Sequence, residues 1–252
     1  MLKNSKMFSF FTKKQYLVDL LNGFVDIHNH ILPGIDDGAK NVEESIALLK
    51  SLDEFGVKSL ICTPHIMHNY HDNNKISINK AYELLKVAMN KNGLSNLRLT
   101  AAAEHMIDDN FENLLLKNEI IGLGNNHLLI EMSYLQPSIN FDGAVEKIKS
   151  KQLFPLLAHP ERYLYFHKTP KVYHRFKENG IKLQLNMLSL SGYYGKEIQK
   201  IAYYLLNNNL IDFIGTDVHH MRHVDGLKKI TLSHKKSNQI DCLIHNTINT
   251  FY

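Results

Sequence analysis

Seven short apolar runs alternate with longer amphipathic segments along this chain, and this alternation constrains the fold more than any other feature. The runs are apolar at nearly every position, as expected for strands that are buried on both faces. A strand followed by a helix, repeated many times, predicts a parallel sheet with helices outside it, either closed into a barrel or doubly wound. The runs cover residues 23–28, 58–65, 97–105, 127–133, 154–162, 182–190 and 211–220.

The segments between the runs carry helix signals. At 41–55, Asn41 is a suitable N-cap, Glu44 follows three residues later, and Gly56 stands after the last turn. We therefore predict one α/β domain over residues 23–252, preceded by an N-terminal helical extension over residues 1–22. Further helices are expected at 76–91, 142–151, 170–179 and 195–208, with a weaker and more polar helical region at 225–250.

The composition excludes several functional classes. No run of eighteen apolar residues occurs, so the sequence predicts no transmembrane helix. Two cysteines, Cys62 and Cys242, are too few for a disulfide framework, and a reducing cytoplasm is the simplest expectation. A net charge of +4, spread without basic blocks, favours an anionic substrate over nucleic acid. The fifteen histidines are the unusual part of the composition.

Residues that bind metals stand at or just after the ends of most runs. Because the strands of a parallel barrel end at one rim, we expect these side chains to lie together. A single tetrahedral zinc needs only three or four ligands, so this set suits two or three divalent ions. Mixed imidazole and carboxylate ligands favour Mn, Fe or Zn. The candidates are His28, His30, Asp37, His65, Glu104, Glu131, His159, Asp217 and His219.

Clustered divalent ions suit the hydrolysis of phosphate esters. They lower the pKa of bound water to about 7, and two ions ~4 Å apart can contact both the attacking and the leaving oxygen. Arg162 and Arg222 stand beside the candidate ligands, and an arginine fork matches phosphate oxygens. For both arginines the alternative is a salt bridge, which for Arg162 would involve Glu161.

Other side chains near the ends of the runs are expected mainly to pack within the fold. We expect Cys62 to pack within its strand, since no second cysteine accompanies it at metal-site spacing. Six aromatic residues could line a cleft for an aromatic substrate, although each alone is expected to pack a loop. They are Tyr134, Tyr163, Tyr165, Phe166, Tyr193 and Tyr194.

Taken together, these motifs resemble the PHP (polymerase and histidinol phosphatase) superfamily. They are most similar to its bacterial manganese-dependent protein-tyrosine phosphatases, which accompany capsule and exopolysaccharide synthesis. The resemblance covers about residues 23–225 and implies a distorted (β/α)₇ TIM-like barrel of the PHP type, with 23–252 as the phosphatase domain. It rests on "DIHNHILPGIDDGAK", "TPH", "AEH", "LLIEMS", "AHPERY" and "GTDVHH".

The resemblance also implies three metal sites and a phosphate-binding pair. Arg162 and Arg222 would bind the phosphoryl group, and Asp26 would orient a ligand histidine. Asn186 is a further candidate, whereas His68, His71, His220 and His223 are left without an assigned role. The implied sites are His28, His30, Glu104 and Asp217 for the first, Glu104, Glu131 and His159 for the second, and Asp37, His65 and His219 for the third.

The implied reaction is hydrolysis of phosphotyrosine in proteins. The expected cofactor is Mn²⁺, with up to three ions bound, and Fe, Zn, Mg or Co would also suit the ligands. The expected substrate is the tyrosine-rich tail of a bacterial tyrosine autokinase that controls polysaccharide export. This partner would bring a cytoplasmic protein close to the inner face of the membrane. No nucleic-acid partner is expected, and an oligomer is left open.

Several alternatives remain at this point. A PHP-type histidinol-phosphate phosphatase would use the same metals, and a non-catalytic module could bind metal or a kinase tail without turnover. An amidohydrolase would need a bridging lysine where Glu104 and Glu131 stand, and a PHP nuclease would need a basic track. A cysteine-based tyrosine phosphatase is excluded, because neither Cys62 nor Cys242 begins a C-x₅-R motif.

Overall fold

The computed structural model describes residues 15–252, and within them the strands form a parallel barrel. The strands pair in the order of the sequence, within two sheets. Just beyond the ends of the first and last strands, a parallel bridge between Asn29 and Val218 joins the chain and closes the barrel. The barrel strands are β2 (Val25–Asp26), β3 (Ser59–Cys62), β4 (His65–Ile66), β5 (Arg98–Ala101), β6 (Glu104–Met106), β7 (His127–Glu131), β8 (Phe154–Ala158), β9 (Lys182–Asn186) and β10 (Phe213–Gly215).

Each of the seven predicted runs contains a strand, but the second and third runs are each broken into two. The first of these breaks falls at Thr63 and Pro64, where proline supplies no N–H for the ladder. As a result β3 pairs with β2 and β5 pairs with β3 in one sheet, whereas β4 and β6 belong to the sheet of β7 to β10. The break distorts the barrel and pairs His65 directly with Glu104 across β4 and β6.

The interior of the barrel is a small apolar core beneath the rim. Val25 from the first strand and Ile27 just after it meet Leu129, Leu156 and Phe213 from other strands of the barrel. Their sequence neighbours, such as Leu128 and Leu157, face the larger core between strands and helices. This alternation follows from the period of two in a strand. The apolar core supports the polar side chains at the carboxyl ends of the strands.

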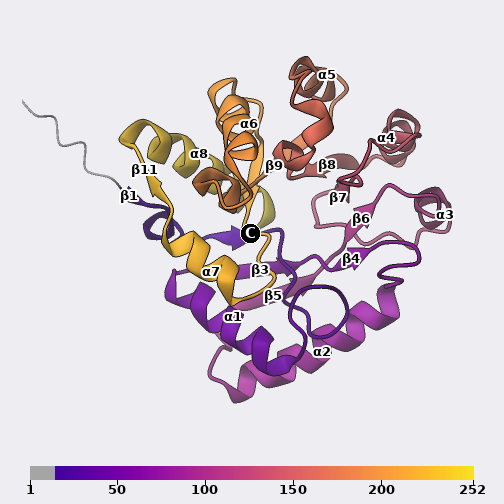
Figure 1. The fold of residues 1–252 in the computed structure, drawn as a ribbon. Helices are drawn as coiled ribbons and strands as arrows, with labels where there is room; N and C mark the ends of the chain where they lie inside the picture. The colour runs from indigo at the N-terminus through magenta and orange to yellow at the C-terminus, as the bar shows by residue number, and fades with distance from the viewer. Residues whose placement is uncertain (1–14) are drawn as a thin grey trace, which may run out of the picture.

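Helices surround the strands, as Figure 1 shows. Asn41 caps the first helix as predicted, because its side chain accepts a hydrogen bond from the Glu44 N–H at 2.9 Å. The polar region predicted at 225–250 is two helices separated by β11 (Thr231–Leu232), and the short α3 was not predicted. The helices are α1 (Val42–Glu54), α2 (Lys75–Lys91), α3 (Phe111–Leu116), α4 (Phe141–Ser150), α5 (Lys171–Glu178), α6 (Lys196–Asn207), α7 (Met221–Lys228) and α8 (His234–Phe251).

The segment before the first barrel strand, where it is described, packs against α7, α8 and the strand between them. β1 (Gln15–Tyr16) pairs antiparallel with β11, and the 3₁₀ helix η1 (Leu17–Leu20) follows it. The remainder of the predicted extension, residues 1–14, lies outside the described residues. Both cysteines are free, with Cys62 buried in β3 as expected and Cys242 exposed on α8. Among residues 15–252, no helix is long and apolar enough to cross a membrane.

Candidate metal centre and active site

Four side chains from three parts of the rim meet above the apolar core. The Nε2 atoms of His28 and His30 lie 3.3 Å apart, and each lies 3.2–3.4 Å from Glu104 Oε2 and Asp217 Oδ1. Ligands about 2.1 Å from a tetrahedral ion are roughly 3.4 Å from one another. All four residues are buried. This group therefore has the spacing of a metal site, and it contains the four residues expected for the first site.

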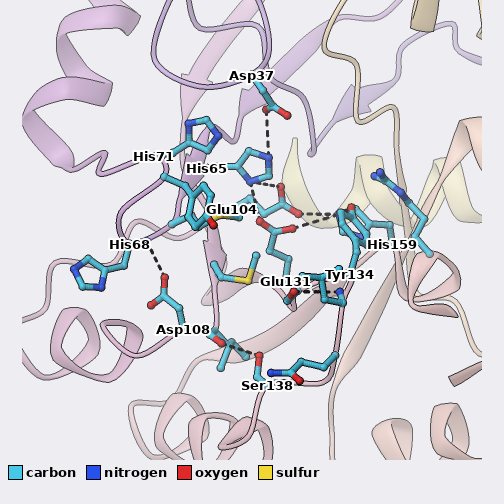
Figure 2. A pocket seen from close by; sticks show the side chains of 18 of the residues that line it. Asp37, His65, His68, His71, Glu104, Asp108, Glu131, Tyr134, Ser138 and His159 are labelled. Carbon is cyan, nitrogen blue, oxygen red and sulfur yellow. Dashed lines mark hydrogen bonds and ion pairs between the residues drawn. The ribbon is translucent and has the colours of Figure 1, made fainter. Parts of the chain in front are cut away.

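A second group lies next to the first and shares Glu104 with it. His65 Nδ1 is 2.8 Å from Glu131 Oε1 and 3.2 Å from Glu104 Oε2. On the other side, His159 Nε2 is 3.0 Å from Glu104 Oε1 and 3.9 Å from Glu131 Oε2. Figure 2 shows the two carboxylates between the two imidazoles. Glu104 can therefore bridge neighbouring ions, as the resemblance implies.

A third group stands at the mouth of the site. Asp37 Oδ1 is 3.5 Å from His65 Nε2 and 3.4 Å from His219 Nε2, and His30 completes the group. The side chain of Asp37 is 60% exposed, whereas the other carboxylates of the cluster are buried. All nine candidate side chains thus meet in overlapping groups at one rim, and Asp37 is the one that faces the solvent.

The cluster fits divalent cations on two grounds. Glu104 Oε2, Glu131 Oε1 and His65 Nδ1 are buried without hydrogen-bond partners, although they face one another. Such atoms are costly unless they are paired or coordinate a cation. Burial opposes charge on Glu104, but the imidazoles of His28 and His65 hold its pKa well below the usual value. In the same way, Asp36 and Asp217 outweigh burial and raise the pKa of His30 well above its usual value. The cluster is thus built to hold positive charge.

A layer of buried polar side chains fixes the candidate ligands. Gln184 Oε1 lies 2.8 Å from His28 Nδ1, Asp36 Oδ2 lies 2.8 Å from His30 Nδ1, and Asn186 Nδ2 donates to Asp217 Oδ2 at 2.7 Å. Such partners set ring orientation and increase metal affinity. Neither the contact of Gln184 nor that of Asp36 was predicted from the sequence. The only signal for Gln184 was a polar residue inside an apolar run.

Asp26 has a different role from the expected one. Its carboxylate accepts hydrogen bonds from the Thr216 N–H at 3.0 Å and the Thr216 hydroxyl at 2.6 Å. It therefore fixes the backbone before Asp217 and makes no hydrogen bond to a histidine ring. Burial raises its pKa to about 6, against these hydrogen bonds.

Two candidate ligands adopt left-handed backbone conformations. His159 has φ 33° and Asp217 has φ 51°, and each directly follows or closely follows the end of its strand. Residues other than glycine rarely adopt such angles, and the cost is of order 1–3 kcal/mol. This strain turns each side chain back over the barrel mouth toward Glu104 and His28. Strained residues of this kind are concentrated at functional sites.

Arg162 lies at the edge of the cluster between two aromatic rings. Its guanidinium carbon is 4.7 Å from the Tyr134 ring centre and 4.3 Å from that of Tyr194, and its Nη1 donates to Asp217 Oδ2 at 2.7 Å. The expected alternative pairing with Glu161 does not form. Glu161 instead accepts hydrogen bonds from Ser189 Oγ and the Asn186 N–H.

The other sequence candidates divide between the site and its surroundings. Arg222 is exposed on α7 and is not among the residues that line the cavity. Tyr134 and Tyr194 line the cavity, whereas Tyr163 is fully buried and packs the loop beneath it. The four histidines that were left without an assigned role all line the cavity, and they are His68, His71, His220 and His223.

The cluster forms one end of a cavity of about 1150 Å³. From the cluster the cavity extends past Tyr134 to the loops that carry His68, Asp108 and Ser138, as Figure 2 shows. Its lining combines the candidate metal ligands and Arg162 with apolar side chains farther out. A phosphate ester bound here would have its phosphoryl group at the cluster and the rest of the molecule in the open part.

Gly38 provides a test of how closely the loop after β2 must pack on the site. A Cβ atom at this position would lie 2.0 Å from the carbonyl oxygen of His30 and 2.6 Å from its Cβ. We expect Gly38→Ala to displace His30 and to weaken metal binding by about 10–100-fold, as for other losses of ligand support. Calorimetric titration of metal-stripped protein with Mn²⁺ measures this change.

Gly180→Ala is the control for the Gly38 variant. Gly180 has φ +76° and no atom within 4 Å of an added Cβ, so its replacement costs about 1 kcal/mol of stability without touching the site. The control is expected to bind Mn²⁺ as the wild type does. Unchanged affinity in Gly38→Ala would show that His30 is not held by this contact.

A cluster of nine candidate metal ligands at the carboxyl rim of a parallel barrel is the arrangement expected of metal-dependent barrel hydrolases of the PHP type. Within that class the chain belongs to the family described as "Capsular polysaccharide synthesis, CpsB/CapC", whose model matches residues 24–238. The match spans every barrel strand and all nine candidate ligands.

Relatives in this family carry phosphatase names. The chain is 28% identical over 199 residues to tyrosine-protein phosphatase YwqE of Bacillus subtilis, covering 79% of this chain and 78% of the relative. It is 28% identical over 204 residues to tyrosine-protein phosphatase CpsB of Streptococcus agalactiae, covering 78% of this chain and 83% of the relative.

Solved structures confirm the barrel fold. A structure described as YwqE from Bacillus subtilis and CpsB from Streptococcus pneumoniae, "unique metal-dependent tyrosine phosphatases", matches with a TM-score of 0.79. The match has 24% identity and covers 90% of this chain and 93% of the other. A histidinol phosphate phosphatase from Lactococcus lactis matches with a TM-score of 0.54 and 12% identity, over 86% of this chain and 94% of the other.

Proposed function

We propose that this chain is a metal-dependent protein-tyrosine phosphatase that acts in capsular polysaccharide synthesis. The observation that carries the proposal is the position of Arg162 beside the cluster of candidate ligands, at the base of a long open cavity. The named relatives of the family support it, since YwqE and CpsB are called tyrosine-protein phosphatases.

The residues of this chain have distinct tasks in the proposed reaction. The nine candidate ligands would hold two or three ions, which supply activated water and stabilise charge on phosphate oxygens. Arg162 would bind phosphoryl oxygens with its fork, and Tyr134 and Tyr194 hold its guanidinium plane in place. The leaving group is a phenol with a pKa of about 10, which departs more readily than the alkoxide of serine.

The depth of the site favours tyrosine over serine. Glu104 and Glu131 are at most 1% exposed, so the phosphoryl group must reach well below the surface. The long phenolic side chain of tyrosine can do so, whereas a phosphoserine would need its backbone to enter the cavity. A cysteine nucleophile has no support, because Cys62 is fully buried with a thiol pKa raised by burial, and Cys242 on α8 does not line the cavity.

We further propose the cofactor, partner and location. Mn²⁺ is the proposed metal, since five imidazoles and four carboxylates are a mixed set that Mn, Fe and Zn accept and that softer metals do not favour. The proposed substrate is the phosphorylated tail of a tyrosine autokinase that controls polysaccharide export. Such a partner would hold this protein in the cytoplasm near the inner face of the membrane.

Phosphate release from defined substrates tests the proposal. We expect metal-stripped protein to regain activity with Mn²⁺ on a phosphotyrosyl peptide, with at least about tenfold lower kcat/KM on the phosphoseryl peptide of the same sequence. His159→Ala is expected to lose this activity, because it removes an imidazole from Glu104. Turnover of histidinol phosphate alone would move the protein to the small-molecule branch of the class, and binding of Mn²⁺ without any turnover would favour the non-catalytic module.

A further inference from the structure

An apolar groove extends from the metal cluster toward the solvent. Three of its side chains are unusually exposed for their type: Tyr70 is 80% exposed, Leu135 92% and Ile139 100%. They lie on two loops that face each other across the outer part of the cavity. We define the apolar groove by six residues that line the cavity there, which are Met67, Tyr70, Met106, Leu135, Pro137 and Ile139.

The walls of the groove are held by hydrogen bonds within one loop and from both loops to the floor. On one side, the backbones of Met67 and His71 exchange two hydrogen bonds, and the His68 N–H donates to Asp108 at 2.8 Å. On the other side, Ser138 Oγ donates to the Ile107 carbonyl oxygen at 2.7 Å. Figure 2 shows Asp108 and Ser138 at this outer end. Both loops are thus fixed to the segment after β6 while their apolar tips remain uncovered.

The size of the cavity calls for more than a phenyl ring. A cavity of ~150 Å³ is enough to hold a benzene ring. The cavity of about 1150 Å³ is several times larger and continuous from the cluster to the groove. A substrate that ends at phosphotyrosine would leave the exposed leucine, isoleucine and tyrosine in water. A polypeptide that continues beyond the phosphotyrosine would cover them.

The charge of the groove restricts what that polypeptide can carry. Apart from the cluster and Arg162, the charged groups lining this end are Asp108 and Asp109, with His68 2.8 Å from Asp109. The side chain of Asp109 is 79% exposed and can repel an acidic residue. An apolar side chain in the groove gains burial, whereas an aspartate there would meet apolar walls and like charge.

We propose that the apolar groove binds the polypeptide on one side of the phosphotyrosine and selects an apolar, non-acidic residue there. This inference rests on the proposed phosphatase function and gives the site a sequence preference within protein substrates. Free phosphotyrosine, which cannot reach the groove, is hydrolysed independently of it. A second copy of this chain is the competing occupant.

Peptide libraries and groove variants together test this proposal. Phosphotyrosyl peptides with leucine or aspartate at each of the three positions on either side are compared by kcat/KM. We expect a preference of about tenfold for leucine at positions on one side, which corresponds to burying part of a leucine side chain. Leu135→Asp and Ile139→Ser are expected to remove this preference while leaving hydrolysis of free phosphotyrosine unchanged.

Ile76→Ser is the matched control for the groove variants. Ile76 is 82% exposed at the start of α2 and does not line the cavity. Its replacement should therefore change neither the preference among peptides nor the hydrolysis of free phosphotyrosine. Equal use of leucine and aspartate peptides by the wild type would overturn the proposal. So would a wild-type dimer that Leu135→Asp converts to monomer, measured by sedimentation at assay concentration, because the groove would then join two copies.

A binding measurement separates failure of the groove from failure of the phosphatase function. Peptides carrying a non-hydrolysable phosphonate in place of the phosphate are titrated into wild type and Leu135→Asp. Weaker binding to the variant supports the groove even if no substrate is turned over. Equal binding, together with turnover of phosphotyrosyl peptides, retains the phosphatase and rejects the groove.

Discussion

Glu104→Gln is expected to lose bound metal and to lose turnover as well. Glu104 uses both carboxylate oxygens, since Oε2 faces His28, His30 and His65 and Oε1 faces His159. An amide of the same shape offers a single acceptor oxygen and no negative charge. It cannot bridge ions, so the stoichiometry of bound metal should fall.

The effect on rate follows from the contribution of the metals. Metal ions supply several kcal/mol of stabilisation to a developing phosphate transition state. Each 1.36 kcal/mol changes the rate tenfold, so we expect kcat/KM on a phosphotyrosyl peptide to fall at least about a thousandfold. Elemental analysis of protein reloaded with Mn²⁺, beside the kinetic assay, measures both changes.

A stability measurement gives an independent view of the same variant. A ligand at a thousand times its Kd stabilises a folded protein by about 4 kcal/mol. Mn²⁺ should therefore raise the Tm of the wild type by several degrees and that of Glu104→Gln by much less. Glu119→Gln, at an exposed position away from the cavity, should behave as the wild type. A Glu104 variant with full metal content and full activity would place catalysis elsewhere.

The nine candidate ligands could be identified in the sequence because parallel strands have a regular geometry. His28, His159 and Asp217 each stand at or just after the end of an apolar run, and parallel strands bring such ends to one rim. Local periodicity therefore carried information about distant contacts. The helix cap at Asn41 could also be predicted, because its hydrogen bond joins residues only three positions apart.

Features that depend on pairing across the barrel could not be predicted from the sequence. Gln184 contacts His28 across 156 positions, and its own run shows only a polar interruption. The breaks in the second and third runs depend on which strands they pair with, although Pro64 hinted at one of them. The position of Arg222 was predicted from its neighbours in sequence, but α7 begins at Met221 and exposes its side chain.

The apolar groove could not be predicted from the sequence, for another physical reason. Leu135 and Ile139 lie in a loop between β7 and α4, and loop side chains have no periodicity that indicates which way they face. Their exposure follows from hydrogen bonds such as that of Ser138 with the Ile107 carbonyl oxygen, which no local pattern encodes.

Arg162→Lys is expected to reduce turnover strongly while leaving the metals bound. Lysine keeps the positive charge beside Asp217 but loses the planar fork and its stacking between Tyr134 and Tyr194. Removing one well-placed donor to a developing oxyanion typically costs 10²–10³ in kcat, and we expect a loss of about this size. The metal content should stay at the wild-type level, because Asp217 keeps its contact with Asn186.

Lysine variants of two other arginines serve as comparisons for Arg162→Lys. Arg175→Lys, exposed on α5, is a control expected to leave kcat/KM unchanged. Arg222→Lys is expected to reduce kcat/KM by less than about threefold, because Arg222 is exposed and does not line the cavity. A loss in Arg222→Lys as large as that in Arg162→Lys would mean that α7 moves when substrate binds and brings a second fork to the phosphate. Full activity in Arg162→Lys would show that charge alone is needed at this position, and that the aromatic rings serve to shape the cavity rather than to align the guanidinium.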